Sequence, residues 1–253
     1  MQPPFPVTFK NGLTAEVTYL ADAADIPVAL QQFGLATACP TLVIVGGASG
    51  LSVEDFERLR SLFKEVVCPF AAAKNFAIID GGTDAGVMQL MGQSRAETGG
   101  QFPLIGVVVE QKAILPASTP PSGDAAALEP YHTHFLLVPG QEWGEESPWI
   151  AQVATTLSAG QPSLTLLING GAIALHQDVP NSLEQERPVL VIGGSGRSAD
   201  RLALAMTGQK PDPEVQGMID SGLLHTVDLT VGIELLRAAL QRVFASVNHG
   251  ANE

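Results

Sequence analysis

The hydrophobic residues of this chain fall into short, nearly continuous runs that alternate with stretches of helical periodicity. Each run is apolar at almost every position and rich in β-branched residues, which is typical of a parallel strand covered on both faces. Six such runs follow one another: Thr41–Val45, Phe76–Ile79, Leu104–Val109, His134–Val138, Leu164–Ile168 and Val189–Ile192. Leu223–Leu229 is a candidate edge strand.

The segments between these runs predict helices. They are Val53–Val67, Gly86–Ala96, Pro148–Ser158, Ala172–Val179, Ala199–Met206 and a closing amphipathic helix, Gly232–Val247. Strands that alternate with helices predict an α/β fold, here a Rossmann-like, doubly wound and mainly parallel sheet with helices on both faces. The Pro-, Ala- and Ser-rich stretch Lys112–Pro130 is expected to be a surface loop.

The first 35 residues have a different pattern and predict a small N-terminal β extension. Phe5–Phe9 and Leu13–Leu20 alternate as strands do, on either side of Asn11-Gly12. This dipeptide is a strong signal for a hairpin turn. We therefore expect residues 1–35 to form the extension and residues 36–253 to form the Rossmann-like domain.

Charge and composition narrow the classes of partner. The 253 residues carry a net charge of −13, which argues against nucleic acid or an anionic membrane surface as the main partner. No apolar run reaches the roughly 18 residues of a membrane helix, and the N-terminus lacks the pattern of a signal peptide. Cys39 and Cys68 have no metal-like spacing and suit free thiols. We expect a cytoplasmic protein without direct membrane insertion.

Glycine clusters follow four of the predicted strands. They are Gly46–Gly50, Gly81–Gly86, Gly170-Gly171 and Gly193–Gly196. In a parallel sheet the turns after the strands meet at the carboxyl edge, where ligands bind. Glycine lets an anion approach the backbone, and a helix N-terminus attracts it. One such turn can serve chain reversal alone, but four at one edge favour a ligand that carries phosphate.

Arg197 is the sharpest candidate for an anion contact. It stands at a predicted helix start, where the helix dipole disfavours a cation unless an anion lies in front of it. The alternative is a surface ion pair with Asp200 or Asp80. Ser195 could cap the helix or bind a phosphate oxygen. The four turns contain neither a Walker loop nor the GxGxxG dinucleotide fingerprint.

These motifs resemble a known family. VGGASG, IIDGGTDAGVMQLMG, HTHFLLV followed by EWGEES, INGGAIALH and VIGGSGRSAD are similar to the successive motifs of the SLOG-type cytosolic domain of melastatin (TRPM) ion channels. They most resemble the free-standing prokaryotic form, known as LSDAT. The superfamily also contains the LOG-type phosphoribohydrolases. The resemblance covers roughly residues 41–206, and it implies a Rossmann-like domain that binds a nucleotide or an NAD-derived ligand such as ADP-ribose and acts as a ligand sensor.

The resemblance also implies which residues would touch that ligand. They are Gly46, Gly47, Ala48, Gly81, Gly82, Thr83, Gly86, Val87, Met88, Gly144, Gly170, Gly171, His176, Gly194, Ser195, Gly196 and Arg197. Met88 would contact a base or ribose face, or else pack in the core. His176 would donate to a phosphate or ribose oxygen, or else lie on a helix surface.

Two departures from the family pattern bear on activity. The hydrolytic branch needs a glutamate in a PGGxGTxxE loop, and the matching stretch, Asn169–Gln177, has none. Where ADP-ribose-binding channel domains carry a tyrosine and an arginine, this chain has Trp143–Trp149, whose Glu145 and Glu146 suit a ribose hydroxyl, an amine or a metal ion rather than a phosphate. We therefore expect binding without hydrolysis.

An enzyme that cleaves an N-glycosidic or phosphate bond of a nucleotide is the alternative. Its candidate catalytic residues would be Asp80, Asp84, Glu145, Glu146 and His176. His132 and His134 are two apart on a predicted strand and would project to one face. A metal site there is conceivable, but a buried histidine bonded to backbone is the preferred interpretation, so no metal site is predicted.

The expected partner is a small phosphorylated ligand. No cofactor is expected to be required besides such a nucleotide or NAD-derived ligand. Relatives in the superfamily often dimerise through helices, so we expect a homodimer. The resemblance also implies a separate effector, which could lie in a membrane.

Overall fold

A nine-stranded sheet organises the protein. The computed structural model describes residues 2–35, 38–47, 53–208 and 210–250. In spatial order the strands are β1 (Phe5–Thr8), β2 (Thr14–Tyr19), β8 (His134–Val138), β5 (Leu104–Val109), β4 (Ala77–Asp80), β3 (Thr41–Gly46), β9 (Ser163–Ile168), β10 (Val189–Gly193) and β11 (Leu224–Asp228). Only the pair β1–β2 is antiparallel, and every other pair of neighbours is parallel.

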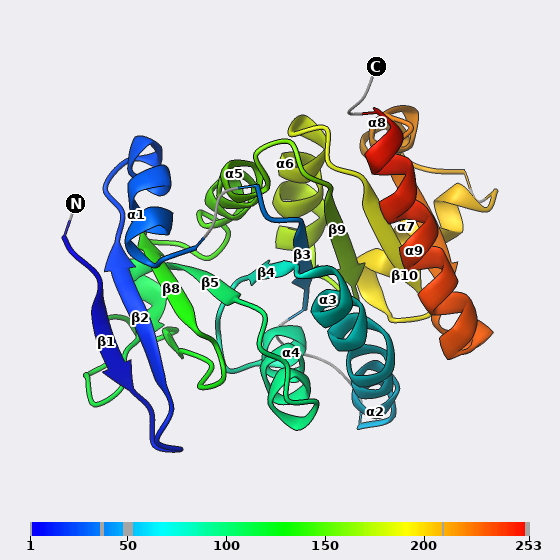
Figure 1. The fold of residues 1–253 in the computed structure, drawn as a ribbon. Helices are drawn as coiled ribbons and strands as arrows, with labels where there is room; N and C mark the ends of the chain where they lie inside the picture. Colours follow the sequence, from blue (N-terminus) through cyan, green and yellow to red (C-terminus); the bar gives the residue numbers. More distant parts are fainter. Residues whose placement is uncertain (1, 36–37, 48–52, 209, 251–253) are drawn as a thin grey trace.

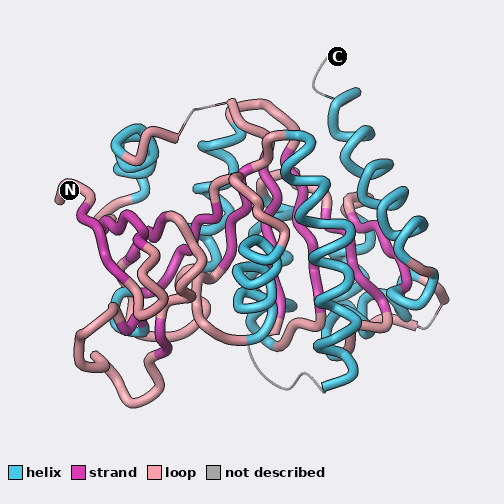
Figure 2. The backbone as a smooth tube through the Cα atoms, turned by 60° about the horizontal axis from the view of Figure 1, so that its bottom comes forward, coloured by secondary structure: helices cyan, strands magenta, loops and turns pink. Residues whose placement is uncertain are grey.

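Helices cover both faces of this sheet (Figures 1 and 2). One apolar core lies under α1 (Ile26–Gln32), α5 (Ser147–Ser158), α6 (Val179–Glu184), α7 (Arg197–Met206) and α8 (Pro213–Asp220). The other lies under α2 (Val53–Leu62), α3 (Cys68–Lys74), α4 (Gly86–Glu97) and α9 (Ile233–Gly250). The fold is thus the predicted doubly wound α/β sandwich, and the continuous apolar runs are the strands buried between its layers.

The N-terminal hairpin continues the same sheet. Gly12 adopts a φ of +83° at the turn, as the Asn-Gly pair predicts. Strand β2 runs parallel to β8, and Glu16 lies opposite His134. A third apolar core, which includes Phe9, Val17 and Phe135, fills the space beneath the hairpin. The division of the chain at residue 35 stays a prediction.

Two predicted helices are longer than the sequence indicated, and both extensions pass through a proline. α2 continues through a π-helical segment, Phe63–Val67, into α3, whose second residue is Pro69. A second π-helical segment, Ala174–Asp178, leads into α6, whose second residue is Pro180. A π-turn widens the helix just where proline lacks an N–H and its ring would meet a carbonyl. The prolines therefore mark widened turns and not helix ends.

The stretch Lys112–Pro130 is not simply the surface loop that its composition indicated. Short strands β6 (Ala113–Ile114) and β7 (Ala126–Ala127) pair within it, and a 3-10 turn at Glu110–Lys112 leads into it. Further 3-10 turns lie at Ala23–Asp25 and Leu229–Val231. Leu128 and Glu129 are buried, and Glu129 N donates to Gly82 O at 2.9 Å. The prediction therefore holds for the exposed middle of the stretch and fails at its ends, where an apolar anchor and a buried carboxylate tie the segment under the β4 turn. Helices α1 and α8 also had no counterpart among the predicted elements.

Strand β3 is the point from which the sheet grows in both directions. Its neighbours are β4, the next strand of the main sheet in sequence, and β9, which follows much later in the chain. A doubly wound sheet forms its ligand crevice at this switch point, outside the carboxyl ends of the strands. In the described part of the chain, no helix is long and apolar enough to cross a bilayer.

Candidate functional site

A cavity of about 510 Å³ lies at the switch point, at the carboxyl edge of β3, β4 and β9. Its walls come from the turns after these strands, from the first residue of α7 and from the segment that leads into α5. The lining residues are Ile44, Val45, Gly46, Gly47, Gly81, Thr83, Ala85, Met88, Asp124, Ala126, Trp143, Glu146, Ile150, Gly171, Ala172, Ile173, Ala174, Asp178 and Arg197. The structure thus brings three of the four predicted glycine turns and Arg197 together around one space.

Arg197 reaches across this cavity from α7 to the glycine turns. A methyl group added at Gly171 would lie 2.9 Å from Arg197 Nη2, and one added at Gly47 would lie 3.2 Å from Nη1. The guanidinium group therefore lies close to the backbone of both turns, and at Gly47 the added methyl group would also lie 2.5 Å from Asn169 Oδ1. Arg197 itself has a φ of +50°, a strained conformation for a residue with a side chain. Strain of this kind persists where the surrounding structure holds a side chain in one place.

Backbone donors face the cavity at the turn after β9. Helical backbone begins at Ala172, and Gly171, Ala172, Ile173 and Ala174 all line the cavity. The first N–H groups of a helix have no partner within the helix, and the helix dipole makes this end positive. Together with the guanidinium group, they form an end of the cavity suited to an anion.

The turn after β4 is held from below by a buried charge network. Asp80 Oδ1 accepts hydrogen bonds from Gly82 N at 2.7 Å and from His132 Nε2 at 2.8 Å. His132 Nδ1 lies 2.8 Å from Glu129 Oε2. Burial alone would lower the pKa of His132, but the two carboxylates outweigh it and raise that pKa to about 9. Asp80 is fully buried, so it positions the turn and does not line the cavity.

The glycines of the β4 turn face in different directions. At Gly81 the nearest atom to an added methyl group would be Met88 Cε, 4.0 Å away, and both residues line the cavity. At Gly82, whose φ is +65°, the methyl group would meet Gly106 Cα at 2.8 Å within the sheet core. Gly82 is therefore a packing requirement, whereas Gly81 leaves room for a ligand.

The turn after β10 is closed by its own hydrogen bonds. Asp200 Oδ1 accepts from Gly194 N at 2.7 Å and from Gly196 N at 3.1 Å. Ser195 is fully buried, and its hydroxyl donates to Ile192 O and accepts from Asn169 N. A carboxylate of the protein thus takes the place that a phosphate was predicted to take, and only Arg197 of this turn lines the cavity.

Two carboxyl groups line the cavity on the side of α5. Glu146 is 8% exposed, and its Oε2 accepts from Gly144 N at 2.8 Å. Asp178 Oδ1 accepts from Ser147 Oγ at 2.5 Å. Burial, reinforced by the nearby Asp178, raises the pKa of Glu146 to about 7, and burial also raises the pKa of Asp178. A group with this pKa can exchange a proton near neutral pH.

Several predicted site residues lie outside the cavity wall. His176 is half-exposed, and its Nδ1 lies 2.5 Å from Glu214 Oε1 of α8. Glu145 caps its own loop, where Oε2 accepts from Gln141 N and Glu142 N, and Asp84 accepts from Gln89 Nε2. Among the described residues, Gly82, Gly86, Val87, Gly144, Gly170, Gly194, Ser195 and Gly196 also do not line it. Ala48 lies outside the described residues. Ligand contacts of all these residues stay predictions.

His132 and His134 do not share a face, so that prediction was wrong. The strand begins at His134, and His132 precedes it. His132 stacks on Phe135 over one face of the sheet, whereas His134 lies against Phe33 at the end of α1 on the other. Burial lowers the pKa of His134 to about 4. In the described residues, no group of three or more acidic, histidine or cysteine side chains is arranged to hold a metal ion.

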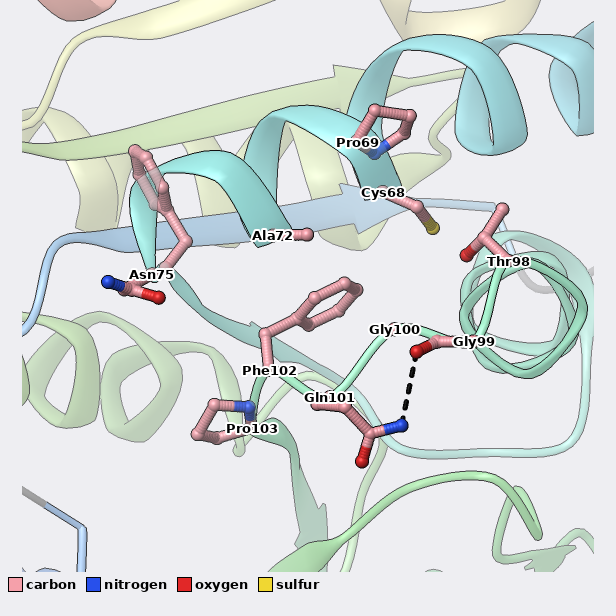
Figure 3. A pocket seen from close by; sticks show the side chains of 11 residues that line it. Cys68, Pro69, Ala72, Asn75, Thr98, Gly99, Gly100, Gln101, Phe102 and Pro103 are labelled. Carbon is pink, nitrogen blue, oxygen red and sulfur yellow. Dashed lines mark hydrogen bonds between the residues drawn. The ribbon is translucent and has the colours of Figure 1, made fainter.

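A second cavity, of about 520 Å³, lies at the opposite edge of the sheet (Figure 3). Cys68 and Ala72 of α3 face Phe102 and the loop after α4 across it, and Gln101 Nε2 donates to Gly99 O at its rim. Burial raises the pKa of the Cys68 thiol to about 11, and both cysteines of the chain are free. None of the predicted site residues lines this cavity.

The sequence matches the family described as SLOG in TRPM, prokaryote, over residues 39–237. This chain belongs to that family. The SLOG domain is 25% identical over 260 residues to a TRPM member-like 2 channel of Nematostella vectensis, with 87% of the chain and 16% of the channel covered. It is 24% identical over 212 residues to TRPM member 2 of Mus musculus, with 70% of the chain and 14% of the channel covered. It therefore spans only about one sixth of the channels that it matches.

Asp178 was missed by sequence reasoning. It lies inside the predicted helix Ala172–Val179 with no motif around it, and in the structure it ends the widened turn Ala174–Asp178 and lines the cavity. The buried partners of His132 were missed as well, because Asp80 ends strand β4 and Glu129 lies in the segment after β7. The sequence did carry a signal for Glu129, because a histidine and a glutamate three residues apart beside a buried strand are seldom both solvent-exposed.

Proposed function

We propose that this SLOG domain binds a nucleotide or an NAD-derived ligand in the switch-point cavity and acts as a ligand sensor. The observation that carries the proposal is the guanidinium group of Arg197 lying against Gly47 and Gly171 at the mouth of a helix N-terminus. An arginine fork and free helix N–H groups are what a phosphate group needs.

The rest of the cavity supports a ligand with a polar, donor-rich portion besides its phosphate. Met88, Ile44 and Ile173 supply apolar surface for a flat ring or a sugar face. Glu146 and Asp178 lie on the wall beside α5 and would repel a second anion. The switch-point cavity thus has one end that suits an anion and one acidic wall. This distribution of charge fits a nucleotide better than an inorganic phosphate or a fatty acid.

Hydrolysis of a nucleotide is the second candidate, and Glu146 is the observation that favours it. A carboxyl group with a pKa near 7 in a binding cavity is suited to general acid catalysis of N-glycosidic bond cleavage. Incubation with NAD and with nucleoside monophosphates, followed by chromatography for released base, tests this candidate. Release that disappears in Glu146→Gln would support it, and no release would leave binding as the function.

Ligand binding is tested by thermal shift with NAD, ADP-ribose, AMP, ATP and cyclic AMP at millimolar concentration. A ligand at 100 times its Kd stabilises the folded state by about 2.7 kcal/mol, which is readily measured. Arg197→Ala should abolish the shift and Arg197→Lys should reduce it, because lysine cannot form the fork. Arg201→Ala, one turn later in α7 and paired with Asp212 on the surface, is the matched control. No shift with any compound would contradict the proposal.

A sensor also needs a target. We propose that the ligand-bound domain acts on a separate effector, together with a second copy of itself, as the resemblance to channel domains suggests. Light scattering with and without the stabilising compound would show whether the domain dimerises. A monomer in both states would remove the dimer from the proposal and leave ligand binding intact.

A further inference from the structure

Two carboxyl groups lie in the switch-point cavity without a cation to neutralise them. Glu146 comes from the residue before α5, and Asp178 from the π-helical turn before α6. Among the residues that the structure describes, neither carboxyl group takes part in an ion pair. Glu146 is 8% exposed and Asp178 is half-buried, and acidic groups in such a cavity without a cation partner mark a candidate ligand site.

Neighbouring protein groups satisfy part of each carboxyl group and fix its orientation. Glu146 accepts from Gly144 N, and Asp178 accepts from Ser147 Oγ. Asp80 and Glu129 each have a fully buried carboxylate oxygen without a hydrogen-bond partner. Glu146 and Asp178 have no such oxygen. The remaining acceptor capacity of Glu146 and Asp178 is therefore open to the cavity that both residues line.

The chemistry of the pair selects among the groups that could meet it. Both groups line the same cavity, and burial raises the pKa of each, so a protonated carboxyl group can donate a hydrogen bond there while the remaining oxygens accept. Vicinal hydroxyl groups both donate and accept, and match this set. A protonated amine would supply donors but no acceptor for a protonated carboxyl group, and a phosphate would be repelled. Among the described residues of the cavity wall, the one further acidic side chain, Asp124, is already paired with Lys112.

We propose that Glu146 and Asp178 form a subsite for the 2′- and 3′-hydroxyl groups of the ligand's ribose, and that the cavity thereby selects ribonucleotides over deoxyribonucleotides. This inference rests on the proposed function, because the phosphate at Arg197 sets where the ribose lies. The two residues determine specificity and take no part in holding the phosphate.

The test compares paired ligands on the wild-type protein by calorimetry: AMP with 2′-deoxy-AMP, and ADP-ribose with 2′-deoxy-ADP-ribose. Loss of a hydrogen bond to a charged group weakens binding by about tenfold or more, so each deoxy compound should have a Kd at least about tenfold higher. Glu146→Gln and Asp178→Asn should lower this ratio toward one while the deoxy compound binds about as before. Glu184→Gln, an exposed glutamate on α6, removes the same charge and should keep the ratio.

The outcomes separate the two proposals. Arg197-dependent binding with equal Kd values for ribo and deoxy compounds overturns the subsite and leaves the proposed function standing. A ratio that persists in both Glu146→Gln and Asp178→Asn, with folding verified by circular dichroism, also overturns the subsite. No binding of any of the four compounds to the wild-type protein overturns both. Because the ribo/deoxy ratio is measured first on the unaltered protein, a variant that fails to fold does not block the test.

Discussion

Removal of the His132 side chain tests whether the charge network under the β4 turn holds the domain together. His132 is buried, with each ring nitrogen 2.8 Å from a carboxylate oxygen, one on Asp80 and one on Glu129. His132→Ala removes the cation that forms hydrogen bonds with both acidic groups in the core. Deletion of one partner of a buried ion pair costs about 3–5 kcal/mol. Since a domain of this size loses roughly 2–4 °C of Tm per kcal/mol, the Tm should fall by about 6–20 °C.

Urea unfolding followed by circular dichroism at pH 7 measures the free energy directly. His134→Ala is the matched control, because His134 is neutral at this pH and its removal costs a contact with Phe33 and a hydrogen bond with Thr133 Oγ1 but no ion pair. We expect that control to cost about 1–2 kcal/mol. Glu129→Gln added to His132→Ala should restore part of the loss, because it removes one unpaired charge while it keeps the shape of the side chain.

The pH dependence follows from the raised pKa of His132. Its value of about 9 in the folded state exceeds the ordinary 6.5, so folding favours the protonated ring. This contribution is fully present below about pH 6.5 and is lost as the pH rises through 9. The difference between the two pKa values corresponds to about 3 kcal/mol. The wild-type protein should therefore lose its advantage over His132→Ala between pH 7 and pH 10.

Three results together would refute this account of the network. They are a loss in His132→Ala no larger than that in His134→Ala, no recovery on adding Glu129→Gln, and a stability difference that is the same at pH 7 and pH 10. The cost would then be that of a cavity and not of charge.

Further predictions concern the glycines and the acidic wall. Gly92→Ala should destabilise the domain by several kcal/mol in urea unfolding, because the added methyl group would lie 2.0 Å from Glu129 Oε2. Gly217→Ala should stabilise the domain by about 0.5–1 kcal/mol, because Gly217 lies in a helix and its added methyl group would have no atom within 4 Å. Gly171→Ala should weaken ligand binding in calorimetry more than it lowers Tm, because the methyl group displaces the guanidinium group from its place. Glu146→Gln should stabilise the domain at pH 8 by about 2–3 kcal/mol, and this advantage should fade as the pH falls to 4. The reason is that the pKa of Glu146 is raised to about 7 in the folded state, so the wild-type protein loses stability as the pH rises through that value. Equal stabilities of the two proteins at pH 8 would contradict the acidic pair.

The sheet was largely predictable because its strands are buried on both faces. Leu104–Val109 and His134–Val138 have the same bounds in the structure as in the sequence pattern. A run that must be apolar at every position leaves little ambiguity. Helix ends were less predictable at Pro69 and Pro180, where a widened turn allows the helix to pass through proline.

The sequence predicted a site residue where its type at that position needs an explanation. It did not predict contacts between segments that lie far apart in the chain. Arg197 was identified because a cation at a helix start needs a reason, and it lines the cavity. Ser195 was predicted to serve a ligand, but it lies buried in a turn whose N–H groups bind Asp200. The partners of His132 are 52 and 3 residues away, and no local pattern links all three.

The order in which β3 and β9 are synthesised has a consequence for how the domain is made in the cell. Thr41 pairs with Ser163, 122 residues later, and β3 is buried along almost its whole length. At roughly 5–20 residues per second, a ribosome takes about 6–24 s to supply β9 after β3. Throughout that time one edge of an apolar strand is open to pairing with other chains. Two walls of the cavity, the turn after β9 and the start of α7, arise after β9, so a ligand can protect only the finished domain and not the nascent one.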